Sequence, residues 1–181
     1  MLSLRAELGA EIRSAKGELI QQIPFEECHS FVKQFAQILY GMLGQIGLYI
    51  KDTAGASNAT TAGNMVMKAN TPAPWTTWGM VIGNGVAAVT MLDYKLASLL
   101  TTNISYGAMG FAIENPEAAT WRAVLSRGFL NNTGAVVDVK EVGLYIRDGA
   151  SKNVCIDRTL YTVAFNNSET LTLTYRISIT L

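Results

Sequence analysis

The chain has 181 residues, enough for one domain with a sizeable core and a short appendage. Hydrophobic residues make up 49% of it and charged residues only 15%, whereas an average soluble domain is about 25% charged. The formal net charge of zero argues against the basic stripe with which proteins hold phosphates, so we expect no direct nucleic-acid partner. So few charges indicate a subunit whose surface is packed among neighbouring chains.

No apolar run reaches the roughly 18 residues of a membrane span, so no membrane partner is expected. Charged residues near the N-terminus occupy the positions where a secretory signal would have its apolar run. We therefore expect the protein to be assembled in the cytoplasm. In that compartment we expect Cys28 and Cys155 to be reduced, with a disulfide between them as the alternative. His29 is the only histidine and no Cys-x-x-Cys spacing occurs, so the sequence predicts neither a metal nor a cofactor.

Residues 1–44 differ from the rest of the chain in their hydrophobic period. Apolar residues recur there at steps of three and four, which predicts an amphipathic helix weakened by Gly9 and Gly17. A second helix is expected to begin at Pro24 and to end between Gly41 and Gly44. We therefore expect a helical N-terminal arm that docks on another surface. Its docking residues are Leu4, Leu8, Ile12, Leu19, Phe31, Phe35, Ile38 and Leu39.

From residue 45 onward the period changes to two, which is typical of strands with one buried face. The clearest segment is 171–181, where apolar and polar residues alternate without a break. Turn sequences rich in Asn and Gly separate the segments. We expect strands at 46–51, 64–68, 78–82, 104–113, 121–130, 136–146, 154–164 and 171–181.

These patterns predict a mainly β protein in two parts. Residues 45–181 are expected to form an antiparallel β-sandwich of about eight strands, jelly-roll-like in its topology, because no helix separates the strands. Residues 1–44 are expected to precede it as the helical arm.

The sequence offers no catalytic constellation, so we expect a protein that is not an enzyme. Cys28 and His29 are adjacent, and in a helix adjacent side chains diverge by about 100° and cannot form a dyad. The 14 acidic residues are scattered and most lie next to turns, so they define no carboxylate pair for hydrolysis.

Glu141 is the one acidic residue expected to point inward, because it alternates in phase with Val139. A buried carboxylate needs a cationic or hydrogen-bonding partner. Arg127 and Arg158 are the candidates, since each lies in an apolar stretch. We expect a structural ion pair, with a role in a binding site as the alternative.

Trp75 and Trp78 follow the proline-rich segment 71–74. We expect them to pack in the core or between subunits. The alternative is an exposed aromatic platform on which sugar rings stack.

Several segments resemble a known group of proteins. They are WGMVIGNG at 78–85, DYKL at 93–96, SRGFLNNTG at 126–134, VKEVGLY at 139–145 and LTLTYRI at 171–177. In this order they resemble small virion structural proteins of tailed bacteriophages, over about residues 78–181. Gly128 and the order Cys155-Ile156-Asp157-Arg158 depart from the pattern.

The resemblance implies a non-enzymatic structural subunit of the virion, most concretely a head-decorating (cement) or minor capsid protein. Its partners would be further copies of itself, with a trimer favoured, and virion proteins such as the major capsid or neck and tail proteins. It would be located in the virion after assembly in the host cytoplasm. Two alternatives remain: a neck, tail or baseplate component, and a carbohydrate-binding (receptor-binding) β-sandwich module that uses Trp75 and Trp78.

Overall fold

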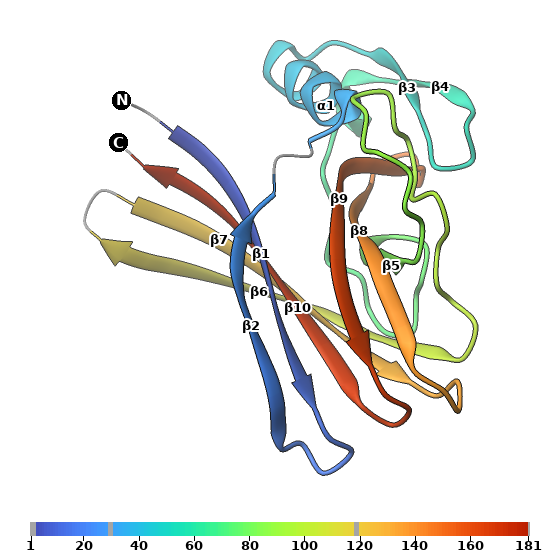
Figure 1. The fold of residues 1–181 in the computed structure, drawn as a ribbon. Coiled ribbons are helices and arrows are strands. Elements are labelled where there is room, and N and C mark those ends of the chain that lie inside the picture. Colours follow the sequence, from blue (N-terminus) through green and yellow to red (C-terminus); the bar gives the residue numbers. More distant parts are fainter. Residues whose placement is uncertain (1–2, 29–30, 118–119, 181) are drawn as a thin grey trace.

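The computed structural model describes residues 3–28, 31–117 and 120–180 (Figure 1). Within these residues the fold is mainly β, with ten strands in antiparallel sheets, one α-helix and one short 3-10 helix. The elements are β1 (Ser3–Arg13), β2 (Leu19–Glu27), α1 (Lys33–Gly44), β3 (Leu48–Lys51), β4 (Ser57–Thr60), η1 (Ala62–Asn64), β5 (Gly79–Gly83), β6 (Ile104–Glu117), β7 (Thr120–Asn131), β8 (Val137–Arg147), β9 (Asn153–Phe165) and β10 (Thr170–Thr180).

Strand β10 is the centre of the larger sheet, whose order is β2-β1-β10-β7-β6. Its burial alternates in the first half of the strand: Leu171, Leu173 and Tyr175 are buried, and the threonines between them face the other side of the sheet. Its register runs without a bulge through eleven pairs with β1 and eleven with β7. The C-terminal segment therefore organises the sheet.

The N-terminal helical arm predicted over 1–44 is wrong for its first part, because residues 3–13 form strand β1. The spacing of Leu8 and Ile12 is four residues, an even number, so it suits one face of a strand as well as a helix. Ala6 and Ala10 occupy the positions between, and all four side chains are buried. Because the buried positions between the large residues are alanines, the two-residue repeat of a strand was not recognised in the sequence.

The second predicted helix is shorter than expected. Pro24 lies in strand β2, at the edge of the sheet, where a missing N–H is tolerated. Helix α1 begins only at Lys33, and Gln45 ends it in a left-handed conformation at φ 50°. The described residues 3–27 are therefore not a separate arm, since β1 and β2 belong to the main sheet.

The smaller sheet, of order β5-β8-β9, packs against one face of the larger one. Arg127 of β7 donates to the carbonyl of Met80 in β5 at 2.8 Å, and Asn131 of β7 donates to that of Phe165 in β9 at 3.0 Å. The buried apolar residues of both sheets form a single core, with Val81, Val139 and Leu171 among its fully buried members. One hydrophobic core therefore holds the two sheets together.

Two predicted strand assignments differ from the structure. Residues 64–68 form no strand, because the 3-10 turn η1 ends at Asn64 and Met65 then packs on helix α1. A Cβ added at Gly41 would lie 2.9 Å from the sulfur of Met65, so this glycine permits the close approach. Strand β4, which pairs with β3, was not predicted from the sequence.

Candidate functional site

The free end of the larger sheet carries an exposed apolar surface, which we call the sheet-end face. Near the two termini β1, β10, β7 and β6 extend beyond the smaller sheet (Figure 1). Ile113 pairs with Ala123, which pairs with Ile177, and Trp121 pairs with Ile179. The sheet-end face consists of Phe111, Ile113, Trp121, Ala123, Ile177 and Ile179.

These side chains point to the same side of the sheet as the core. Trp121 alternates in phase with the buried Leu125, and Ile179 with the buried Tyr175. Phe111 and Ile113 lie beyond the bulge in β6 and pair with Leu125 and Ala123 of β7, which places them on the same side. Ile113 is nevertheless 70% exposed. The sheet-end face is thus a continuation of the core side of the sheet that no described part of the chain covers.

An apolar groove of about 420 Å³ leads from the sheet-end face into the space between the sheets. Phe111, Leu125 and Ile177 line it on the larger sheet, and Leu144 and Ile156 line it on the smaller one. A contiguous apolar surface on a soluble domain marks a place where another molecule binds.

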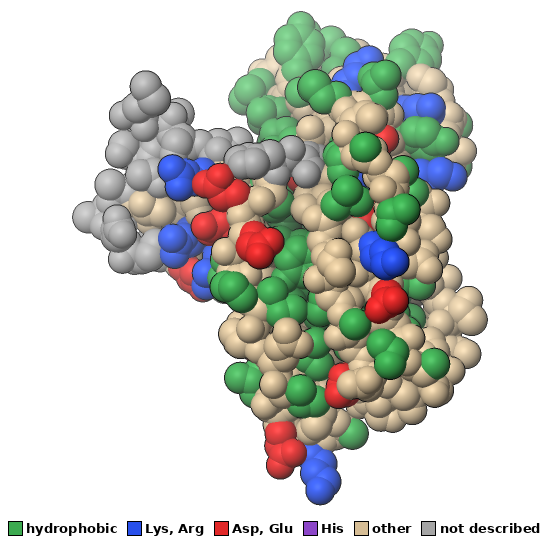
Figure 2. All heavy atoms as spheres, in the orientation of Figure 1, with side chains coloured by type: hydrophobic (Ala, Val, Ile, Leu, Met, Phe, Trp, Pro, Cys, Tyr) green, Lys and Arg blue, Asp and Glu red, His purple; other side chains and the backbone are tan. Residues whose placement is uncertain are grey.

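Helix α1 presents a second exposed apolar region, which is visible at the top of the molecule in Figure 2. Its buried side is Gln34, Ile38 and Gly41. Leu39, Tyr40 and Leu43 lie on the solvent side, and Leu43 is 79% exposed. The apolar surface of helix α1 is therefore wider than the side that packs against the core.

Glu141 is fully buried, and the structure brings Arg158 to it. Arg158 Nε lies 2.8 Å from one carboxylate oxygen of Glu141. The carboxylate also accepts hydrogen bonds from the backbone N–H groups of Gly85 at 3.0 Å, Ala97 at 3.0 Å and Ser98 at 2.7 Å. This single side chain therefore fastens the long loop 84–103 to β8.

Arg158 also reaches Asp93, whose carboxylate lies 2.6 Å from its Nη1. It donates further hydrogen bonds to the carbonyls of Ala87 and Ala88. Burial alone would raise the pKa of Asp93, but hydrogen bonds from Thr90 and the ion pair with Arg158 hold it below its usual 3.8. The network is satisfied internally and presents no free group to a ligand.

Arg127 lies apart from Glu141 and binds backbone instead. Its guanidinium donates to the carbonyls of Gly107 at 2.8 Å, Trp78 at 2.9 Å and Met80 at 2.8 Å, and also to that of Trp75. Burial lowers its pKa to about 10, so it remains charged at neutral pH. Its role is to join β7 to the 75–80 segment across the two sheets.

The aromatic platform of Trp75 and Trp78 is not formed. Trp78 is buried in the core, with the Arg147 guanidinium 5.7 Å from its ring centre, whereas Trp75 is half exposed. Trp78 precedes strand β5, and its neighbour Met80 is also buried. Of this pair only Trp75 is exposed, so the two rings do not form a shared surface for a sugar ring.

The residues expected to form the docking arm have several different environments. Leu8, Ile12 and Ile38 are buried in the core, and Leu19 and Leu39 are exposed. Phe31 and Phe35 are partly buried and stack with ring centres 4.2 Å apart. The side chain of Leu4 and the whole of His29 lie outside the described residues.

The two cysteines are free and buried. Burial raises the pKa of the Cys28 thiol to about 12 and raises that of Cys155 still further. Thiols that stay protonated are poor nucleophiles and poor metal ligands. The described residues contain no group of three or more His, Cys, Asp and Glu side chains that could hold a metal ion.

In the described part of the chain, no helix combines the length and the apolar character needed to cross a membrane. Comparisons of the chain with protein-family models, with curated proteins and with solved structures give no match. The site must therefore be interpreted from its own geometry.

The sheet-end face was missed in the sequence, although each of its strands was predicted. Strands β6 and β7 have 14 and 12 residues, whereas β5 has five. Strands β8 and β9, with 11 and 13 residues, are nearly as long as the hairpin, so strand length alone does not reveal the open face. It depends on how the two sheets are offset, which no local sequence pattern records.

Proposed function

We propose that the chain is a non-enzymatic structural subunit that assembles with copies of itself through the sheet-end face. The observation that carries the proposal is the exposure of Phe111, Ile113, Trp121 and Ile179 on the core side of a long sheet. Exposed apolar area of this kind is stabilised when a complementary surface covers it.

The proposed occupant of this surface is a second copy of the chain. The exposed side chains of the sheet-end face are apolar, so a matching apolar surface complements them better than a charged partner does. The net charge of zero offers no repulsion between copies. Strand β6 beside it is an edge strand of the larger sheet, and of its described outer backbone groups the N–H of Met109 already donates to the Thr71 carbonyl at 2.9 Å.

The proposed setting is a tailed-bacteriophage particle, with the subunit as a head-decorating or minor capsid protein and a trimer as the favoured assembly. The segments that carry the resemblance include β5, β8 and the centre of β10, which pack the two sheets together. The finer fold assignment, a jelly-roll-like β-sandwich, belongs to this proposal. It is supported by the passage of the chain from the larger sheet to the smaller between β7 and β8, and back between β9 and β10.

The test is the mass of the purified protein by light scattering across a dilution series. The wild type should be an oligomer. Ile113→Glu should raise the dissociation constant of this oligomer at least tenfold. Assembly would bury the new carboxylate without a partner, which costs well over the about 1.4 kcal/mol that a tenfold change represents. The matched control is Val136→Glu, which changes an exposed valine just before β8. A monomeric wild type, or an Ile113→Glu oligomer as stable as the wild type, would contradict the proposal.

A further inference from the structure

Helix α1 carries an apolar stripe on the side that faces away from its own core. Four exposed residues have the spacing i, i+3, i+4 and i+7, which places them on one face of a helix. They are Ala36, Leu39, Tyr40 and Leu43, and we call them the helix ridge. The side of the helix turned to the core includes the polar Gln34. An apolar stripe of this spacing normally packs on a core, so the helix ridge indicates a surface that another molecule covers.

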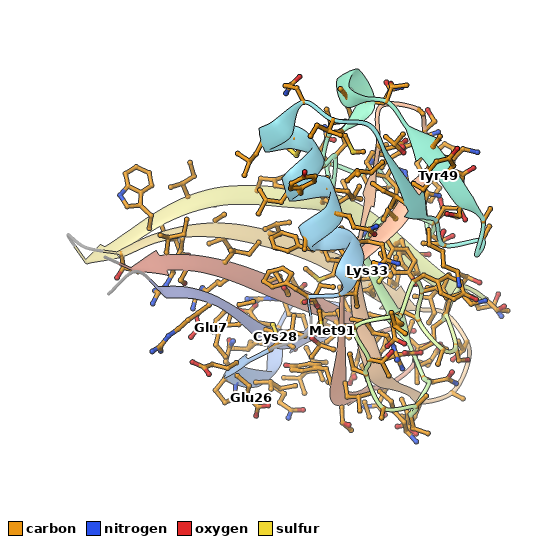
Figure 3. All side chains as sticks on the ribbon, turned by 90° about the horizontal axis from the view of Figure 1, so that it is seen from above. Glu7, Glu26, Cys28, Lys33, Tyr49 and Met91 are labelled. Carbon is orange, nitrogen blue, oxygen red and sulfur yellow. The ribbon has the colours of Figure 1, made fainter. Side chains whose placement is uncertain are left out.

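The helix ridge is free of charge, which restricts the surface that can cover it. Figure 3 shows Lys33 at the start of helix α1, and Lys33 is the only charged residue of this helix. The last turn has no basic residue, so the negative end of the helix dipole is not neutralised within the helix. The complementary surface is therefore apolar, with a positive charge where the C-terminal end of the helix would lie. Helices with this spacing of apolar residues commonly bind in apolar grooves.

The apolar groove beside the sheet-end face has these properties. Its described lining residues are apolar except for Lys68 and Asn70, and Lys68 is the only charged one among them. Lys68 is exposed, so its ammonium group is accessible to an incoming helix end. None of the described lining residues belongs to helix α1, so the helix ridge of the same chain does not fill the groove. The groove is thus open to the helix ridge of another copy.

The symmetry of a closed ring also requires two different surfaces. A two-fold contact joins one surface to itself, whereas a ring of three copies joins one surface of each copy to another surface of the next. The sheet-end face and its groove provide one of these surfaces. The helix ridge provides a second apolar surface on a different element of the chain, and Leu43 in it is 79% exposed. The two surfaces can therefore form every contact of such a ring.

We propose that the helix ridge of one copy docks into the apolar groove of the next copy, so that the chains assemble head to tail. Leu39, Tyr40 and Leu43 would insert at the open edge between the two sheets. Lys68 would lie near the C-terminal end of the incoming helix and interact with its negative dipole end. This head-to-tail contact rests on the proposed function, and it names the surface that covers the sheet-end face.

The first test places a charge on the helix ridge and measures assembly of the full chain by light scattering. Leu43→Glu should raise the dissociation constant of the oligomer at least tenfold, because docking would bury a carboxylate without a partner. Val136→Glu is the control and should assemble as the wild type does. If Ile113→Glu weakens assembly and Leu43→Glu does not, the head-to-tail contact is overturned and the proposed function stands. A monomeric wild type would contradict both.

The second test identifies the two surfaces in the contact by cross-linking. Chains with Leu43→Cys and chains with Ile113→Cys, one of them lengthened by a tag, are mixed, allowed to assemble and treated with a flexible dimaleimide. The native cysteines are buried, so the introduced thiols should react first. We expect cross-linked pairs of one long and one short chain to exceed pairs of like chains. Pairs formed mainly between two Ile113→Cys chains, or no mixed pairs in an assembled sample, would overturn the head-to-tail contact.

Discussion

Arg158 Nε and the Glu141 carboxylate lie 2.8 Å apart with both side chains buried. Because Glu141 also accepts three backbone hydrogen bonds from the 84–103 loop, the pair holds this loop as well as strands β8 and β9. The loop in turn supplies Met91 and Leu92 beside the start of helix α1. One buried ion pair thus holds in place the loop that contacts the start of helix α1.

We expect Glu141→Ala to lower the free energy of unfolding by about 3–5 kcal/mol, because it leaves Arg158 charged and buried without its partner. Chemical denaturation measures this loss. The control is Glu114→Ala, which removes a more exposed ion pair with Arg176 at 3.5 Å and should cost less than about 1 kcal/mol. Equal effects of the two changes would show that Glu141 has no special structural role.

Arg127→Met should destabilise the protein by roughly 3–5 kcal/mol, since it removes the donor for several carbonyl groups in the interior. Arg122→Met on the same strand, where the side chain is only partly buried, should cost less than about 1 kcal/mol. Thermal unfolding compares the two variants. A stable Arg127→Met protein would mean that water replaces the guanidinium.

Asp157 predicts a pH dependence of stability. Burial raises its pKa to about 6 from 3.8, so the folded state holds this proton more tightly than the unfolded chain does. Its contribution to stability is therefore complete below about pH 4 and is lost as the pH rises through about 6, a difference of about 3 kcal/mol. Urea unfolding across this range should show the fall in the wild type and not in Asp157→Asn. An identical pH profile for both proteins would refute the assignment.

Deleting residues 1–28 should prevent folding, because β1 covers one edge of β10 through eleven residue pairs. The deletion would expose the backbone of β10 and remove Leu8 and Ile12 from the core. Loss of a cooperative thermal transition is the expected result. A truncated chain that unfolds cooperatively would instead mean that the N-terminal strands are an appendage.

Strands were predictable from the sequence where large apolar residues occupy every second position, as in 171–181. Strand β1 was not predictable, because alanines occupy some of its buried positions. Leu8 and Ile12 fit a helix and a strand equally, and only the pairing of β1 with β10 decides between these. That pairing joins opposite ends of the chain, which no local pattern records. The inward position of Glu141 was predictable from alternation alone.

The choice between Arg127 and Arg158 was not predictable, because both stand in apolar stretches. Strand β9 pairs with β8, which brings Arg158 opposite Gly143 and near Glu141. Strand β7 lies in the other sheet, which directs Arg127 to the carbonyls around Met80.

The central claim is that copies of the chain cover the sheet-end face, and hydroxyl-radical footprinting tests it most directly. Trp121 lies on that face and is 58% exposed, whereas Trp75 lies outside it and is 51% exposed, so each molecule carries its own reference. At concentrations where the protein is assembled, we expect Trp121 to be oxidised far less than Trp75, and dilution should abolish the difference. Equal oxidation of the two tryptophans at every concentration would contradict the claim.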